Sequence, residues 1–212
     1  MITLASAALE RVVVIGAHSD DIEIGCGGTL LTLAGRHPEA EFVWAVLTGG
    51  DERADEARAS AEAFFGDGRR PVLELGGLDD GRLPFTADAK EFVADIGRRF
   101  PADLVLTHQR DDLHQDHRHC GELALQTFRS ALILEYEIPK YDGDLGRPSL
   151  YQPLSPEISA HKLDHLDAHF GSQRGKPWYD RELFAGLMRL RGMEAGSAIH
   201  AEAFYARKLI LT

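Results

Sequence analysis

Residues 12–21 read VVVIGAHSDD, an unbroken apolar run that is followed at once by a polar cluster, His18 to Asp21. Apolar runs without alternation are typical of strands that helices cover on both faces of a sheet. Open α/β sheets bind their ligands at the carboxyl ends of such strands. This stretch therefore predicts both an α/β fold and the place where its function lies.

Further along the chain, similar apolar runs occupy residues 42–48, 72–75, 104–107 and 132–138. Amphipathic stretches at 28–36, 53–65, 88–100 and 117–129 separate them and favour helices. This alternation predicts a Rossmann-like three-layer αβα sandwich with a mostly parallel sheet, built as one domain over residues 1–212. Beyond Pro139 we expect a long irregular loop over 141–154, a helix from Ser155 to about Phe170, and a short strand within 203–211.

Composition excludes several classes of function. The chain has 212 residues and a formal net charge of −11, without the basic patch that nucleic-acid binding requires. Cys26 and Cys120 lie far apart and form no CxxC spacing, so we expect neither disulfides nor a thiolate zinc site, and a cytoplasmic location. No segment approaches the roughly 20 apolar residues of a membrane span.

A second polar cluster, HQRDDLHQDH at 108–117, follows the fourth expected strand. In doubly wound sheets the first strand lies beside the strand that begins the other half, so the two clusters can meet there. His18, Asp21 and His117 could then bind one ion and leave a coordination position open, as in catalytic zinc sites. We expect Zn²⁺, with Fe²⁺ as an alternative at a site that lacks sulfur ligands.

The remaining polar residues of both clusters supply candidates for the other roles in hydrolysis. Asp20 adjoins a ligand without having to bind the metal, which suits a general base. His114 lies one helical turn before His117 and could stabilise an oxyanion. Asp116 could orient one of the imidazoles through its free ring nitrogen. These residues predict a metal-dependent hydrolase.

These motifs resemble the LmbE-like or PIG-L-type de-N-acetylases, whose signatures are His-Pro-Asp-Asp after the first strand and a later His-x-x-His. The matching stretches are AHSDD at 17–21, CGGTL at 26–30, LTGGDE at 47–52, RADEA at 53–57, DDGRL at 79–83 and HQDH at 114–117. The resemblance implies zinc on His18, Asp21 and His117, Asp20 as base, and a protonated His114 as stabiliser of the tetrahedral intermediate. It also implies a small-molecule N-acetylated amino sugar as substrate and Arg53 as a substrate contact.

The sequence departs from the family pattern at two positions. Ser19 stands where the family usually has Pro, and Ile22 stands where an acidic residue is frequent, which leaves the role of Glu23 open. Neither change removes a proposed ligand or base.

Two other functions compete with deacetylation. Two histidines and one carboxylate also form the facial triad of non-heme Fe²⁺ oxygenases. A catalytically silent sugar-binding module could retain the same fold. The glycines of GCGGTL, at 25–30, lack the GxGxxG spacing of a dinucleotide site and follow an acidic loop that would repel pyrophosphate.

Several residues keep two interpretations. Three histidines spaced by four would form one stripe on a helix: His161, His165 and His169. We favour a polar helix face with one histidine near the active-site mouth, and a second metal site is the alternative. Trp178 could stack on a sugar or pack in the core. His108 and His119 could be structural or contact substrate, and His200 and Glu202 could approach the metal pocket. The sequence names neither the acetylated substrate nor the oligomeric state, so a homo-oligomer stays open.

Overall fold

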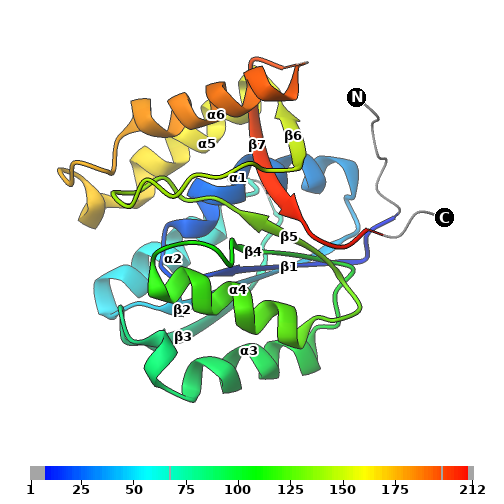
Figure 1. Ribbon diagram of the computed structural model, residues 1–212, viewed down its shortest axis with the longest axis vertical. Helices are drawn as coiled ribbons and strands as arrows, with labels where there is room; N and C mark the ends of the chain where they lie inside the picture. The colour runs from blue at the N-terminus through cyan, green and yellow to red at the C-terminus, as the bar shows by residue number, and fades with distance from the viewer. Residues whose placement is uncertain (1–7, 67, 197, 210–212) are drawn as a thin grey trace.

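The computed structural model describes residues 8–66, 68–196 and 198–209. Its sheet has seven strands in the order β3-β2-β1-β4-β5-β7-β6 (Figure 1). Neighbouring strands from β3 to β5 run parallel, whereas β7 runs antiparallel to both β5 and β6. The strands are β1 (Arg11–Gly16), β2 (Glu41–Thr48), β3 (Val72–Leu78), β4 (Leu104–His108), β5 (Leu132–Tyr136), β6 (Leu150–Leu154) and β7 (His200–Ala206).

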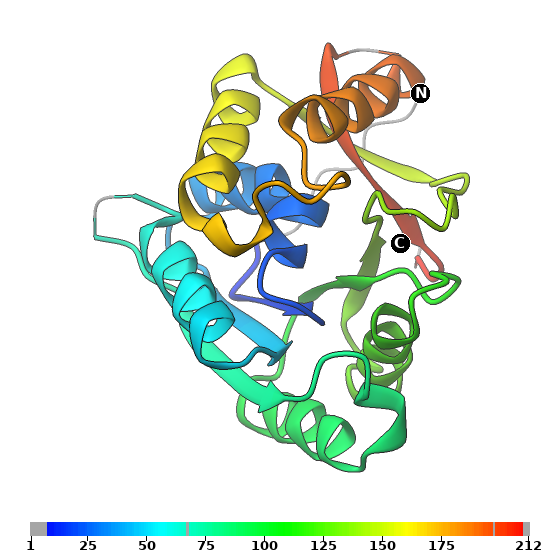
Figure 2. The same ribbon diagram turned by 90° about the vertical axis from the view of Figure 1, so that its left-hand side faces the viewer.

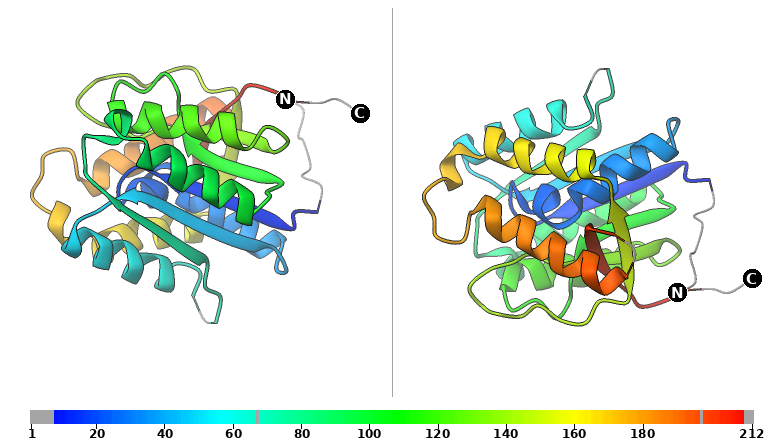
Figure 3. Two further views of the ribbon diagram at one scale, coloured as in Figure 1. Left: turned by 90° about the horizontal axis from the view of Figure 1, so that it is seen from below. Right: turned by 90° about the horizontal axis from the view of Figure 1, so that it is seen from above.

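Helices cover both faces of the sheet, which confirms the predicted three-layer αβα arrangement (Figure 3). The helices are α1 (Asp21–Arg36), α2 (Asp51–Ala63), α3 (Asp88–Arg99), α4 (Gln115–Thr127), α5 (Pro156–His169) and α6 (Arg181–Ala195), with short 3₁₀ turns η1 (Leu83–Phe85) and η2 (Gly171–Gln173). One hydrophobic cluster joins the sheet to α1, α2, α5 and α6, and a second joins it to α3 and α4.

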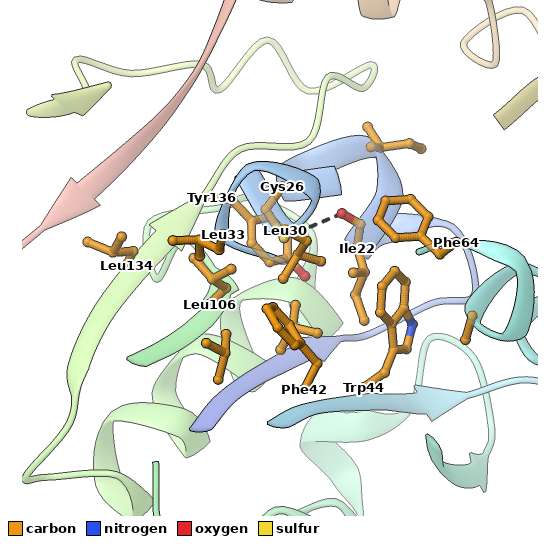
Figure 4. Close-up of a cluster of buried hydrophobic side chains, with 14 of the residues drawn as sticks. Ile22, Cys26, Leu30, Leu33, Phe42, Trp44, Phe64, Leu106, Leu134 and Tyr136 are labelled. Carbon is orange, nitrogen blue, oxygen red and sulfur yellow. Dashed lines mark hydrogen bonds between the residues drawn. The ribbon is translucent and has the colours of Figure 1, made fainter. Parts of the chain in front are cut away.

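Strand β1 shows why the deciding stretch is apolar throughout. Val12 and Val14 belong to the cluster under α1, while Val13 and Ile15 belong to the cluster under α3 and α4. All four side chains are fully buried. Figure 4 shows the cluster under α1, where Trp44 of β2 and Phe64 gather with other buried side chains, their ring centroids 5.1 Å apart.

Helix α1 begins at Asp21, so the prediction that it begins at Gly28 was wrong. The segment carries glycines because it packs closely: a Cβ on Gly25 would lie 2.2 Å from the Tyr136 ring. The helix is interrupted at Cys26, whose φ of −145° is not helical. The glycines thus serve close packing at an interrupted helix, and we find no need for a dinucleotide to explain them.

The C-terminal third differs most from expectation. Part of the expected loop 141–154 is the edge strand β6, where Pro153 is tolerated because an edge strand has unpaired backbone groups. Helix α6 was not predicted. The expected terminal strand is present as β7 but begins earlier, at His200, and residues 210–212 lie outside the described residues.

The cysteines and the helix lengths bear on the expectations of no disulfide and no membrane span, within the described part of the chain. There, Cys26 and Cys120 are buried and form no disulfide. None of the described helices is both long enough and apolar enough to cross a membrane.

The strand order reverses between β1 and β4, which pair with each other. Helix α1 follows β1 on one face, and α4 follows β4 on the other. The turns that lead into these two helices therefore lie side by side at the carboxyl edge of the sheet, which faces the viewer in Figure 2.

Candidate active site

The two polar clusters meet at this edge. His18 Nδ1 lies 3.1 Å from His117 Nε2, although 99 residues separate the two histidines in sequence. The turn after β1 is held by Asp21, whose side chain accepts the backbone N–H of His18 at 2.6 Å. All three side chains are at most 7% exposed. The topology thus brings together the three residues predicted to bind the metal.

The donor atoms of these residues form a compact triangle. Asp21 Oδ2 lies 3.2 Å from His18 Nδ1, and Asp21 Oδ1 lies 3.4 Å from His117 Nε2. Tetrahedral zinc with ligand bonds of about 2.0–2.1 Å places its donors about 3.3–3.4 Å apart, close to each of these distances, with Asp21 reaching the two imidazoles through different oxygens. The structure also offers overlapping sets around the same imidazoles, one with His114 and one with His108.

His117 is prepared to act as a neutral donor. Burial, together with the nearby His108, lowers its pKa to about 4, so its imidazole carries no charge at neutral pH. Its other nitrogen, Nδ1, lies 3.1 Å from Asp112 Oδ2, and Asp112 accepts a second bond from Lys140 Nζ at 2.9 Å. A carboxylate on the far nitrogen fixes the tautomer and the ring orientation of a metal-binding histidine.

His108 is a residue whose part in the site the sequence left open. It is fully buried at the end of β4, and its Nε2 lies 3.1 Å from Asp21 Oδ2. Its ring stacks on His117 with centroids 4.1 Å apart. Burial excludes contact with substrate, so His108 supports two of the three candidate ligands. In the sequence, its place directly after the expected strand 104–107 was the signal that could have assigned it to the site. His119 instead lies near Glu122 on the helix surface.

Asp20 is buried beside the triangle without sharing it. It is 1% exposed, its Oδ2 has no hydrogen-bond partner among the described residues, and its Oδ1 lies 3.6 Å from Arg53 Nη2. Burial and the negative charge of Asp21 raise its pKa to about 6. A carboxyl group with a pKa near neutrality can both take up and release a proton under ordinary conditions.

His114 caps α4 and faces both histidine ligands. Its Nδ1 accepts the backbone N–H of Asp116, which leaves the proton of the neutral ring on Nε2. Its ring centroid lies 5.0 Å from that of His18. Burial and the charge of His18 lower its pKa, which favours the neutral ring over the protonated form expected from the family resemblance.

Asp116 is fully buried and does not line the cavity. Its carboxylate accepts the backbone N–H groups of Gly81 and Leu83, at 2.6 and 3.1 Å, and lies 3.4 Å from His18 Nε2. It therefore holds the 79–83 loop against the site and can orient His18. That loop delivers Asp80, which pairs with His18 and with Arg53 Nη1 at 2.9 Å and was not among the predicted site residues.

A cavity opens over these residues. Its inner end is lined by His18, Asp20, His117 and Arg53, and its outer wall comes from segments around Tyr141 and Trp178. Trp178 is half-buried there and packs against the core, which confirms the packing interpretation, while stacking on a sugar stays a prediction.

The other open residues lie elsewhere. None of the three histidines of α5 lines this cavity, and His165 is buried with its Nε2 2.8 Å from Ser60 Oγ, so the expected polar face with a histidine at the mouth was wrong. Glu202 does not reach the site but accepts the N–H groups of Gly28 and Thr29 in α1. His200 also stays outside the cavity lining.

Comparison with known proteins adds sequence and structural relatives. The sequence profile of the family described as PIG-L: GlcNAc-PI de-N-acetylase matches residues 13–128. The uncharacterized deacetylase YaiS of Escherichia coli (strain K12) is 30% identical over 176 residues, which are 78% of this chain and 95% of that protein.

Among solved structures, N,N'-diacetylchitobiose deacetylase from Pyrococcus horikoshii superposes with a TM-score of 0.73 at 19% identity, over 92% of this chain and 83% of that one. The 4-carboxy-2-hydroxymuconate hydratase of Pseudomonas putida KT2440 superposes with a TM-score of 0.76 at 18% identity, over 96% and 98% of the two chains. Because a deacetylase and a hydratase share this fold, the fold alone does not select the reaction.

Proposed function

Because this chain belongs to the PIG-L family of GlcNAc-PI de-N-acetylases, we propose that it removes the N-acetyl group from an N-acetylated amino sugar or sugar conjugate by metal-dependent hydrolysis. One observation carries the proposal: the donor triangle of His18, Asp21 and His117 lies beside a buried carboxylate, Asp20, that has an unpaired oxygen. Hydrolysis needs a cation site and a base next to each other, and this edge of the sheet supplies both.

The cation would be held by His18 Nδ1, Asp21 and His117 Nε2. Imidazole and carboxylate suit Zn²⁺, and Fe²⁺ is the alternative because no sulfur ligand is near. When bound, such an ion supplies a water of lowered pKa and polarises the substrate carbonyl. Asp112, His108 and Asp116 keep the donors in place through the contacts described above.

Asp20 is the proposed base. With a pKa of about 6 it is ionised at neutral pH, and its Oδ2 has no partner within the described chain that would compete for a proton. It takes the proton from the attacking water and can return it to the amine that leaves as the amide C–N bond breaks. Arg53, 3.6 Å away, limits how far burial raises its pKa.

His114 is the proposed stabiliser of the oxyanion. Because its Nδ1 accepts a backbone N–H, the neutral ring keeps a proton on Nε2 that it can donate. Hydrogen-bond donors that face developing charge need no reorganisation during the reaction. Arg53, which also lines the cavity, is the proposed contact to the sugar.

The oxygenase alternative also uses two histidines and one carboxylate. An oxygenase mechanism has no role for Asp20, a second buried acid whose pKa is raised to about 6. A silent binding module likewise would not explain why Asp20 Oδ2 is buried without a hydrogen-bond partner among the described residues. We therefore favour hydrolysis over both.

The test is release of acetate from N-acetylglucosamine and N,N'-diacetylchitobiose by the purified chain. We expect activity to vanish with a chelator and to return with Zn²⁺. Asp20→Asn should retain metal and lose turnover, whereas His117→Ala should lose both. Activity that a chelator does not affect, or full activity of Asp20→Asn, would contradict the proposal.

A further inference from the structure

Two loops of the C-terminal third form the outer wall of the cavity. One spans residues 137–149 between β5 and β6, and the other spans 170–180 between α5 and α6 (Figure 2). The cavity that they close off measures roughly 250 Å³. Their exposed side chains take no part in the proposed hydrolysis, so their role must concern what enters the cavity.

Each loop contributes an aromatic side chain to the cavity lining. Tyr141 is 74% exposed and makes no ring contact or side-chain hydrogen bond within the described chain. Trp178, on the other loop, is half-buried and meets Tyr179 edge-on with centroids 5.6 Å apart. The negative face of an aromatic ring attracts C–H groups such as those on one side of a pyranose, and stacking also removes apolar surface from water.

Lys176 differs from the other cations of the cavity lining. Arg53 is paired with Asp80, and Lys140 is paired with Asp112 at 2.9 Å. Lys176 Nζ instead lies 2.7 Å from the neutral amide oxygen of Gln173 and 6.0 Å from the Trp178 ring centroid. No described carboxylate pairs with it, and Gln173 is only 1% exposed, so the ammonium is held at the wall with its charge uncompensated.

The acids of the cavity restrict where a negatively charged part of a substrate could lie. Asp20 and Asp80 stand beside the proposed cation site and Asp142 lies on the loop between β5 and β6, and a like charge placed next to any of these carboxylates would be repelled. Of Arg53, Lys140 and Lys176, only Lys176 has no carboxylate partner among the described residues, so we expect an acidic substituent to lie beside it, next to Trp178.

Resting on the proposed deacetylase function, we propose that Tyr141, Trp178 and Lys176 form a subsite for the part of the substrate beyond the N-acetylated ring. The two aromatic residues stack on this part, and Lys176 binds an acidic group that it carries, a phosphate or a carboxylate. The chain is then a deacetylase of acidic sugar conjugates, and loop 170–180 determines that specificity.

The test compares acetate release by the Zn²⁺-loaded protein from three probes. N-acetylglucosamine 1-phosphate and N-acetylmuramic acid carry the two kinds of acid, and methyl N-acetylglucosaminide is neutral. We expect wild-type kcat/KM to be higher for at least one acidic probe than for the neutral one. Lys176→Gln should lower kcat/KM for the preferred acidic probe about tenfold, through KM, because a hydrogen bond to a charged group contributes about 1.5 kcal/mol or more. The neutral probe should change less than twofold.

Matched variants separate binding of the acidic group by Lys176 from a change in the net charge of the cavity. Asp142→Asn alters the charge of the same cavity lining from the other loop, and we expect it to change the acidic-to-neutral ratio much less than Lys176→Gln does. Trp178→Ala and Tyr141→Ala should raise KM for every probe about threefold to tenfold, and Trp178→Phe should restore most of the loss. Phe85→Ala, which removes an 81% exposed ring outside the lining, should change nothing.

The outcomes distinguish the two proposals. If wild-type protein releases acetate but prefers the neutral probe, or if Lys176→Gln affects acidic and neutral probes equally, the acidic subsite is wrong while deacetylation stands. If Asp142→Asn shifts the ratio as much as Lys176→Gln, the preference reflects net charge and the assignment to Lys176 fails. If none of the probes, nor N-acetylglucosamine or N,N'-diacetylchitobiose, yields acetate, the proposed function fails and the subsite with it.

Discussion

The buried ion pair between Lys162 of α5 and Glu202 of β7 should be the most sensitive point of the scaffold behind the active site. Lys162 Nζ lies 2.6 Å from Glu202 Oε1, and the two side chains are 2% and 3% exposed. The pair lies at the interruption of α1. Glu202 accepts the N–H groups of Gly28 and Thr29, while Lys162 donates to the carbonyl of Ile24.

Replacing Lys162 with Met should destabilise the protein by about 3–5 kcal/mol, because it leaves the buried Glu202 carboxylate without its counter-charge. For a chain of this size each kcal/mol corresponds to about 2–4 °C, so the Tm should fall by roughly 6–20 °C. Glu202→Gln should have a similar effect, since it leaves a buried ammonium unpaired. Urea unfolding in the presence of a chelator measures both variants without any contribution from bound metal.

The double variant Lys162→Met with Glu202→Gln separates the pair from its neighbours. It leaves no charge at the site of this pair, so we expect its loss of stability to be smaller than the sum of the single losses by at least about 2 kcal/mol. If the two effects add to within about 0.5 kcal/mol, or if Lys162→Met loses less than about 1 kcal/mol, the pair does not hold the interrupted helix as argued.

Three further predictions concern single residues at or near the site. Asp20 must be ionised to act as base, so kcat/KM should rise with pH up to about 6, its pKa, and Asp20→Asn should lose about 10²-fold to 10⁴-fold at pH 7. A bound cation lowers that pKa, so an acidic limb centred above pH 7 would contradict the role. His108→Gln should weaken zinc binding about 10-fold to 100-fold, measured by competition with a chelating dye, because it removes the ring that contacts Asp21; unchanged affinity would show that the contact is idle. Burial raises the pKa of Glu23 from 4.5 to about 8, so its favourable contribution is complete below pH 4.5 and is lost as pH rises to 8. Wild-type stability should therefore fall relative to Glu23→Gln by about 3 kcal/mol between pH 5 and pH 8 in chelator-treated protein, and parallel urea-unfolding curves across that range would refute it.

Local patterns in the sequence were sufficient for the parallel half of the sheet. Each strand from β1 to β5 contains a short apolar run, and the stretches between these runs are polar or amphipathic, most clearly α3, so no distant contact is needed to recognise the alternation. The two polar clusters could be paired because a doubly wound sheet leaves few places where the first and fourth strands can meet.

The C-terminal third could not be predicted in this way. Strand β6 contains Pro153 and, within the described part of the chain, pairs only with β7, which comes about 50 residues later, so its formation depends on a contact that local sequence does not encode. The start of α1 failed for a related reason. Glycines normally weaken a helix, and their presence is explained by residues distant in sequence: a Cβ on Gly25 would meet the Tyr136 ring, and one on Gly28 would meet Leu154.

Asp20 and Asp21 show how much of the assignment depends on surroundings rather than on residue type. They are adjacent in sequence and both are almost fully buried, yet their pKa values are displaced in opposite directions. Burial raises both, but for Asp21 the three imidazoles of His117, His108 and His18 outweigh burial and lower the pKa.

Asp20 faces one guanidinium at 3.6 Å, which does not outweigh burial and the charge of its neighbour. A carboxylate that stays ionised among imidazoles is suited to bind a cation with them, whereas one that can gain a proton near neutral pH is suited to exchange it with water. The same amino acid at consecutive positions thus supports two different proposed roles. The imidazoles around Asp21 and the burial of Asp20 beside a second carboxylate, not the type of residue, therefore determine which of the two binds the cation and which exchanges a proton.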